Sequence, residues 1–133
     1  MYLDPDVAAL GPDAGEVGVR EFREIVGASA APVKARIMDQ HALAGVGNLL
    51  ADEALWQAAI DPRRAARELS HDELGALHRA LRTAIRSAIR QGGVHTGVVV
   101  AHRTKGGHCP RCGAEMARAT VGGRTTWRCS REQ

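Results

Sequence analysis

Three cysteines near the C-terminal end have the spacing of a metal-binding hairpin. Cys109 and Cys112 form a C-x2-C pair, and sixteen residues separate Cys112 from Cys129. In a zinc ribbon, two loops bring thiolates with such spacing to one tetrahedral metal ion. A segment this short and this poor in apolar residues would draw much of its folding energy from the bound metal. We therefore expect a zinc-binding hairpin that uses these three thiols.

The fourth ligand is not a cysteine. A second C-x2-C pair would place Cys or His at position 132, where this chain has Glu132. His108, which precedes Cys109, and His102 are the other candidates. The alternative to a filled site is a metal-free hairpin with three reduced thiols, and a disulfide is disfavoured in a cytoplasmic protein. We expect one zinc ion, held more weakly than four cysteines would hold it.

A second chemical signal is the Gly-Val-Gly-Asn stretch at 45–48, which stands between two short apolar helical patterns. A glycine turn that opens a helix exposes backbone N–H groups at the positive end of the helix dipole, and such a turn binds anions, phosphate above all. Asn48 can cap the helix and point its amide at the same anion. An ordinary tight turn between two helices is the alternative interpretation.

The strongest predicted helix follows these elements. Ser70 and Glu73 form an S-x-x-E capping box, and Gly92 and Gly93 end the helix. An apolar stripe runs along it, made of Leu74, Leu77, Leu81, Ile85, Ala88 and Ile89. Another face carries Arg79, Arg82, Arg86 and Arg90. These arginines suit a polyanion, but they also suit the ordinary solvated face of an amphipathic helix.

The remaining elements are shorter. Three helices are predicted at 16–27, after Pro32 over 33–40, and at 48–58. Two strand-like stretches flank Gly122 and Gly123, which is a strong signal for a two-residue hairpin. The fold class expected is mainly α, with four helices followed by a small β-hairpin. We divide the chain into a lead-in at 1–15, a helical domain at 16–93, and a linker with the hairpin at 94–133.

Charge is distributed unevenly along the 133 residues. The net charge is +3, but residues 1–62 carry 4 basic and 10 acidic side chains, while residues 63–133 carry 14 basic and 5 acidic ones. A basic C-terminal half favours a polyanionic partner such as a nucleic acid. No apolar run approaches the length of a membrane span, and the acidic, proline-broken start does not resemble a signal peptide. We expect a monomer in the cytoplasm, at the nucleoid when bound to DNA.

These motifs together resemble one family. The stretch "DQHALAGVGNLLADEALWQAAIDPRRAA", the long helix ending "RQGG" and the terminal "CPRCG…GGRTTWRC" are similar to the C-terminal half of the formamidopyrimidine-DNA glycosylase and endonuclease VIII family. The resemblance covers about residues 10–131. It implies a helix-two-turns-helix DNA-binding domain followed by a zinc finger.

The resemblance also implies roles for individual residues. Asn48 matches the asparagine of the turn that holds the DNA backbone beside the lesion, and Lys34 matches a basic residue ahead of that turn. Arg124 matches the zinc-finger arginine at the hairpin tip, which contacts phosphate. The three cysteines match three of four zinc ligands. The predicted DNA contacts are therefore the side chains of Lys34, Asn48 and Arg124 and the backbone of Gly47.

The sequence departs from the family in ways that bear on activity. Family enzymes begin with a β-sandwich domain that carries a proline nucleophile and a neighbouring glutamate, and we expect this chain to lack both, so no catalytic residue is assigned. Three functions remain open. The first, which we favour, is a DNA-binding module without catalysis that leaves chemistry to a separate protein. The others are a residual glycosylase or lyase, and a vestigial interaction protein.

Overall fold

The computed structural model describes residues 10–133, so the prediction for positions 1–9 of the lead-in lies outside the described residues. In chain order the elements are α2 (Val19–Gly27), α3 (Val33–Met38), α4 (Asn48–Gln57), the 3-10 helix η1 (Ala66–Glu68), α5 (His71–Gln91), the 3-10 helices η2 (Val94–Thr96) and η3 (Val100–His102), and strands β1 (Met116–Val121) and β2 (Arg124–Cys129). The expectation of a mainly helical fold that ends in a small hairpin is confirmed. None of the helices in the described range is both long and apolar enough to cross a membrane.

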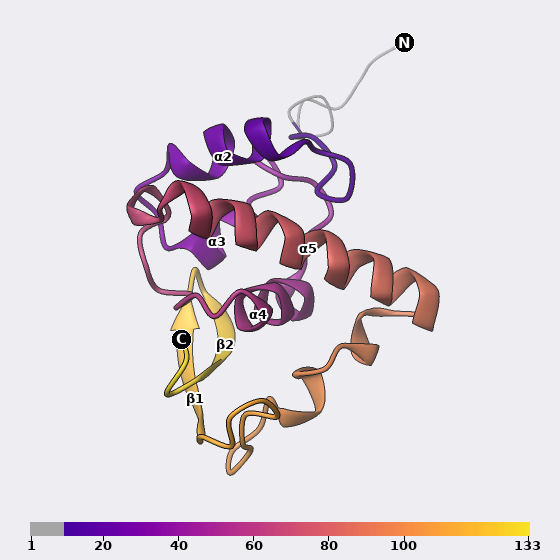
Figure 1. The fold of residues 1–133 in the computed structure, drawn as a ribbon, viewed down its shortest axis with the longest axis vertical. Coiled ribbons are helices and arrows are strands. Elements are labelled where there is room, and N and C mark those ends of the chain that lie inside the picture. Colours follow the sequence, from indigo (N-terminus) through magenta and orange to yellow (C-terminus); the bar gives the residue numbers. More distant parts are fainter. Residues whose placement is uncertain (1–9) are drawn as a thin grey trace.

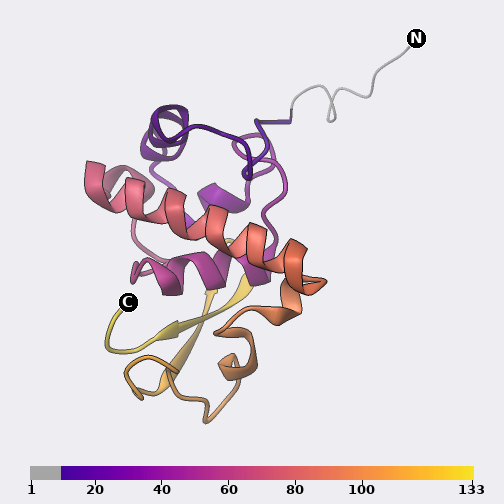
Figure 2. The ribbon, with the colours of Figure 1, turned by 45° about the vertical axis from the view of Figure 1, so that its right-hand side comes forward.

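The helices form a stack with the hairpin at one end (Figures 1 and 2). In both views α5 crosses the middle of the molecule, with α2 on one side of it and α4 on the other, and the hairpin lies beyond α4. α4 contacts both α5 and β2. α4 therefore joins the helical body to the hairpin.

α4 also joins two apolar clusters. The larger one fills the space between the helices and includes Phe22, Leu55 and Leu77, each of them completely buried. The smaller one surrounds the C-terminal end of α4, where Trp56 packs with Val99 and with residues of the hairpin. Ala51 and Ala54 of α4 are fully buried, and their small side chains let the neighbouring helices approach α4 closely.

α5 begins and ends as its sequence predicts. The Ser70 side chain accepts from the Glu73 backbone N–H at 3.1 Å, and the Glu73 carboxylate accepts from the Ser70 backbone N–H at 2.9 Å. Gly92 ends the helix with a positive φ of 92°. The apolar stripe is shorter than predicted, because α5 extends past α4 (Figure 1) and leaves Ile89 76% exposed.

The first helix begins at Val19 and not at Glu16. The residues before it form a turn closed by Asp13, whose carboxylate accepts from the Gly15 N–H at 2.8 Å and whose carbonyl accepts from the Val17 N–H at 2.9 Å. Val17 is buried by this turn. Asp13 also forms a β-bridge with Ala44, so this segment is fixed against the loop between α3 and α4.

The hairpin turn has the predicted geometry. Gly122 and Gly123 have φ values of 58° and 77°, which a two-residue type I′ turn requires at both positions. A Cβ atom at Gly122 would lie 2.9 Å from the Cβ of Ala35 in α3. The turn therefore touches α3, and glycine is needed there both for the backbone conformation and for this close approach.

Candidate nucleic-acid interface and metal centre

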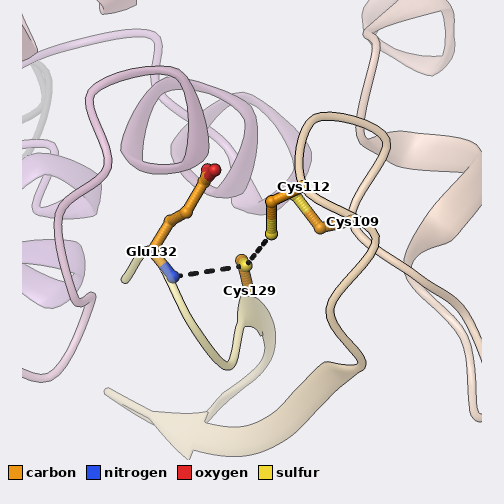
Figure 3. A group of neighbouring side chains, drawn as sticks. All are labelled: Cys109, Cys112, Cys129 and Glu132. Carbon is orange, nitrogen blue, oxygen red and sulfur yellow. Dashed lines mark hydrogen bonds between the residues drawn. The ribbon is translucent and has the colours of Figure 1, made fainter.

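The predicted cysteines come together in the structure. Cys109, Cys112 and Cys129 lie with Glu132 so that one ligand atom from each is within 4.8 Å of the others (Figure 3). The sulfur atoms of Cys112 and Cys129 are 3.4 Å apart. Neither His108, which is exposed, nor His102 belongs to this group, so of the three candidates for the fourth ligand the structure brings Glu132 to the thiols.

This arrangement fits a tetrahedral metal ion. Thiolates at about 2.3 Å from a shared zinc ion would have their sulfurs roughly 3.8 Å apart, close to the separation of Cys112 and Cys129. Soft thiolates with one carboxylate form a donor set that suits zinc better than calcium or magnesium. The four residues could therefore hold one metal ion, and the geometry alone leaves its identity open.

The thiols differ in acidity. Burial raises the pKa of Cys109, but hydrogen bonds from the indole N–H of Trp56, at 3.2 Å, and from backbone N–H groups outweigh it and lower the pKa to about 7. A backbone N–H bond from Ala114 lowers the pKa of Cys112, whereas burial and the neighbouring Cys129 thiol raise it, to about 11 overall. Because the pKa of Cys112 is raised, a metal that binds this sulfur as a thiolate would release its proton at neutral pH.

Glu132 is held in place by its neighbours, through contacts that were not predicted from the sequence. Its carboxylate forms an ion pair with the guanidinium of Arg111, and that guanidinium lies 4.3 Å from the ring centre of Trp56. The next residue, Gln133, accepts from the Cys129 backbone N–H at 2.8 Å and donates to the Ile60 carbonyl at 3.0 Å. The C-terminal end is thus tied to both the hairpin and the helical body.

The Gly-Val-Gly turn leads directly into the first turn of α4. Gly45 has a φ of 95°, and the Gln40 amide braces the turn by accepting from the Gly45 N–H at 2.9 Å and donating to the Val46 carbonyl at 3.2 Å. Gly47 is the N-cap residue, and no side chain caps the helix. The first backbone N–H groups of an α-helix have no intrahelical acceptor, so this end of α4 presents donors to an anion.

Asn48 does not cap α4, contrary to our expectation. It is the first residue of the helix, and its amide nitrogen donates to the Thr125 carbonyl of the hairpin at 3.1 Å. The amide oxygen is buried and has no hydrogen-bond partner in the described range. Asn48 therefore connects the start of α4 to β2 beside Arg124, which is exposed at the hairpin tip.

Lys34 is fully buried and is not the surface cation that a phosphate contact needs. Its ammonium lies 2.7 Å from the Asp52 carboxylate and 2.7 Å from the Thr126 hydroxyl. Burial lowers the pKa of Lys34, and Asp52 opposes that effect. A direct contact with phosphate would require the ammonium to leave both of these partners, so Lys34 in this structure joins α3, α4 and β2.

Asp52 holds the hairpin against the helical body, a role that was not predicted from the sequence. Besides Lys34, its carboxylate pairs with the Arg103 guanidinium at 2.8 Å and accepts from the Trp127 backbone N–H at 3.1 Å. Glu53 is also buried and accepts from the Val99 N–H at 3.0 Å. The available signal was an acidic pair flanked on both sides by apolar residues in the middle of α4, which indicates buried partners.

Comparison with known proteins places the chain in a family. Residues 9–99 match the family model described as "Formamidopyrimidine-DNA glycosylase H2TH domain". The chain belongs to this family. The predicted resemblance is confirmed, and the helical body with its glycine turn is the part that the family model covers.

Relatives of known sequence and structure agree. The chain is 39% identical to the formamidopyrimidine-DNA glycosylase of Thermomicrobium roseum over 98% of this chain and 47% of that protein. It is 36% identical to the corresponding protein of Roseiflexus sp. over 84% of this chain and 46% of that one. The chain thus spans about half the length of the curated relatives it matches.

Among solved structures, MutM in complex with DNA that contains carbocyclic 8-oxo-G is similar with a TM-score of 0.82 and 32% identity. That match covers 94% of this chain and half of the other. The Lactococcus lactis Fpg in complex with abasic-site DNA matches with a TM-score of 0.80 and 29% identity, over 91% of this chain and half of the other. Both relatives hold DNA in those structures.

Proposed function

We propose that this chain binds DNA through backbone phosphates, with the Gly47 backbone, Asn48 and Arg124 making the contacts. The observation that carries the proposal is the hydrogen bond from the Asn48 amide to the Thr125 carbonyl, because it holds the uncapped start of α4 beside the hairpin tip. A helix N-terminus and an arginine on one surface form a phosphate site. The relatives solved with DNA support the same ligand.

Lys34 has a positioning role in this proposal. Its ammonium, together with Asp52, joins the hairpin to α3 and α4, and so sets where Arg124 stands relative to the start of α4. Loss of Lys34 would weaken DNA binding by displacing the hairpin. Its effect should therefore be accompanied by a loss of thermal stability, whereas the effect of losing the exposed Arg124 should not.

A salt titration tests the phosphate contacts. Each neutralised phosphate contributes about 0.9 to the slope of log affinity against log salt for duplex DNA. Arg124→Gln should lower that slope by about one and weaken all duplex sequences alike, because backbone contacts carry no sequence information. Arg90→Gln, which removes an exposed charge at the end of α5, is the matched control and should leave the slope unchanged. A sequence-selective loss with Arg124→Gln would contradict the assignment.

For the cysteine cluster we propose zinc, since three thiolates and a carboxylate form a borderline-soft set. Protein purified without chelators should contain about one zinc per chain, and Cys112→Ser should release it. The Asp52 contacts hold the hairpin without help from the metal, so we expect the helical body to keep its fold in that variant. Absence of zinc together with an unchanged melt in Cys112→Ser would mean that the site is vestigial.

We further propose that the 133-residue polypeptide does not excise oxidised bases. Lyase chemistry needs an accessible amine for a Schiff base. The chain has two lysines: Lys34 is buried and paired with Asp52, and Lys105 is exposed and forms no ion pair with the described residues 10–133. Borohydride treatment of the protein with an 8-oxoguanine duplex should trap nothing. A trapped adduct that disappears in Lys105→Gln would overturn this.

A further inference from the structure

A groove runs along the face of the hairpin, next to the loop that follows η3. It has a volume of about 570 Å³, which lies within the range of small-ligand sites, about 300–1,000 Å³. Its walls include Lys105 from the loop, Glu115 just before β1, Arg118 of β1, and Thr125 and Trp127 of β2. The DNA contacts proposed above leave this groove unused.

The strand register determines which side chains meet in the groove. Arg118 pairs directly with Trp127 across the two strands, so the guanidinium and the indole lie on the same face as neighbours. The backbone of Trp127 is fixed by its N–H bond to Asp52, at 3.1 Å. The backbone that carries the indole is therefore anchored by a part-buried hydrogen bond, the ring packs against the smaller apolar cluster, and a cation lies beside it.

A second cation faces this pair. Lys105 stands at the tip of a tight turn that is closed by a hydrogen bond from the Gly107 N–H to the Thr104 carbonyl, at 2.9 Å. Neither Lys105 nor Arg118 forms an ion pair with any residue of the described range 10–133, and both are exposed. With one carboxylate, Glu115, against two cations, the groove is basic.

These groups match the chemistry of an unpaired nucleotide. An aromatic ring offers a stacking platform to any base, and neighbouring cations bind the phosphates on either side of it. An acidic peptide would use the cations but leave the indole idle, and an apolar ligand would leave two cations buried without partners. We infer that this groove binds one or two unpaired nucleotides of a single DNA strand, with the base on Trp127 and the phosphates on Arg118 and Lys105.

The groove adjoins the proposed duplex contacts through Thr125. The Thr125 side chain lines the groove, and its carbonyl accepts from the Asn48 amide at 3.1 Å. A strand that leaves the duplex site at Asn48 and Arg124 would therefore enter the groove directly. The inference rests on the proposed DNA binding for the identity of its ligand, and it adds a preference for DNA with an unpaired segment.

The test compares single-stranded with duplex DNA on the whole chain. A fluorescein-labelled thymidine oligonucleotide of about 12 residues, within the site sizes of single-strand binders, is titrated at several salt concentrations beside an intact duplex. The main variant is Lys105→Gln with Arg118→Gln. Its matched control is Arg86→Gln with Arg90→Gln, which removes the same charge from exposed positions on α5. Trp127→Phe probes the stacking platform.

For the single strand, loss of two phosphate contacts should lower the salt slope by about 1.4 in the Lys105/Arg118 variant and leave it unchanged in the control. Trp127→Phe should weaken single-strand binding about fivefold. The affinity for the intact duplex should change less than twofold in the Lys105/Arg118 variant and in Trp127→Phe.

An unchanged single-strand salt slope in the Lys105/Arg118 variant would overturn the inference, as would an equal fall of the slope in the control variant. The inference would also fail if polyglutamate displaced the labelled oligonucleotide as effectively as the unlabelled oligonucleotide does. Both side chains of the main variant are exposed, so it decides the question even if Trp127→Phe fails to fold. Failure of the proposed function shows differently. In that case the wild-type chain does not bind the duplex and Arg124→Gln has no effect, whatever happens in the groove.

Discussion

Substitution of Asp52 by asparagine should destabilise this protein more than any change on its surface. Asp52 is 1% exposed, and its carboxylate forms ion pairs with two cations, the ammonium of Lys34 at 2.7 Å and the guanidinium of Arg103 at 2.8 Å. Asparagine keeps the size of the side chain and can still accept the hydrogen bond from the Trp127 N–H. The substitution therefore removes the negative charge and leaves Lys34 buried without a counter-ion.

The expected loss of folding free energy follows from the buried Lys34 ammonium that is left without a counter-ion. Removing one partner of a buried ion pair destabilises a protein by about 3–5 kcal/mol. We expect the lower end, about 3 kcal/mol, because Lys34 can release its proton and Arg103 can turn toward water. For a domain of this size that corresponds to a fall in melting temperature of roughly 10 °C.

The loss should depend on pH with a defined sign. Burial holds the pKa of Lys34 below its ordinary value of 10.5, and removal of Asp52 takes away the effects that oppose this lowering. A group whose folded pKa is lowered binds more protons in the unfolded state, so stability rises with pH between the folded and unfolded values. The destabilisation by Asp52→Asn should therefore be complete below the folded pKa and shrink as the pH rises toward 10.5.

Urea denaturation followed by circular dichroism measures these quantities. Glu24→Gln, which removes an exposed carboxylate from α2, is the matched control and should change the free energy of unfolding by less than about 0.5 kcal/mol. Adding Lys34→Met to Asp52→Asn should restore part of the loss, since no stranded ammonium remains. A loss below about 1 kcal/mol at neutral pH, or no recovery in the double variant, would show that Lys34 is not left as an unpaired buried charge.

Two further predictions concern stability. Gly97→Ala should destabilise the fold by about 1–3 kcal/mol, because a Cβ there would lie 2.2 Å from the Glu53 carboxylate, whereas Gly18→Ala meets nothing within 4 Å and should be neutral or stabilising in the same thermal melts. Equal effects of the two would contradict the assigned clash. The hydrogen bond from Arg64 holds the pKa of Glu73 below its ordinary 4.5. Its contribution is complete above pH 4.5 and is lost as the pH falls through the lowered value, so urea melts of Glu73→Gln should show a flatter decline of stability in acid.

Local sequence signals predicted the elements well. The capping box at Ser70, the glycine pair at the hairpin turn and the glycine at the end of α5 act through neighbouring residues, so their geometry can be inferred from short stretches. The start of α2 was set three residues early, because the Asp13 turn before it also buries apolar side chains. The three cysteine thiols also lie close together, as the cysteine spacing predicted.

Side-chain roles that depend on distant partners could not be inferred in the same way. From the sequence alone, a lysine ahead of a glycine turn is predicted to be a surface cation. Only the packing of α3 against α4 and the hairpin shows that Lys34 is buried beside Asp52. Asn48 follows a glycine turn and was expected to cap the helix, yet it is the first residue of α4 and its amide reaches the hairpin carbonyl of Thr125. Such contacts depend on how the elements are arranged, which no short stretch of sequence encodes.

The most direct measurement of the DNA-binding surface is an amide chemical-shift map of the ¹⁵N-labelled chain titrated with a short duplex. We expect the largest shifts at the start of α4, at Gly47 and Asn48, and at Arg124 on the hairpin tip, and we expect them to diminish together as salt is added. Shifts concentrated on the arginines of α5, with Gly47, Asn48 and Arg124 unmoved, would contradict this expectation.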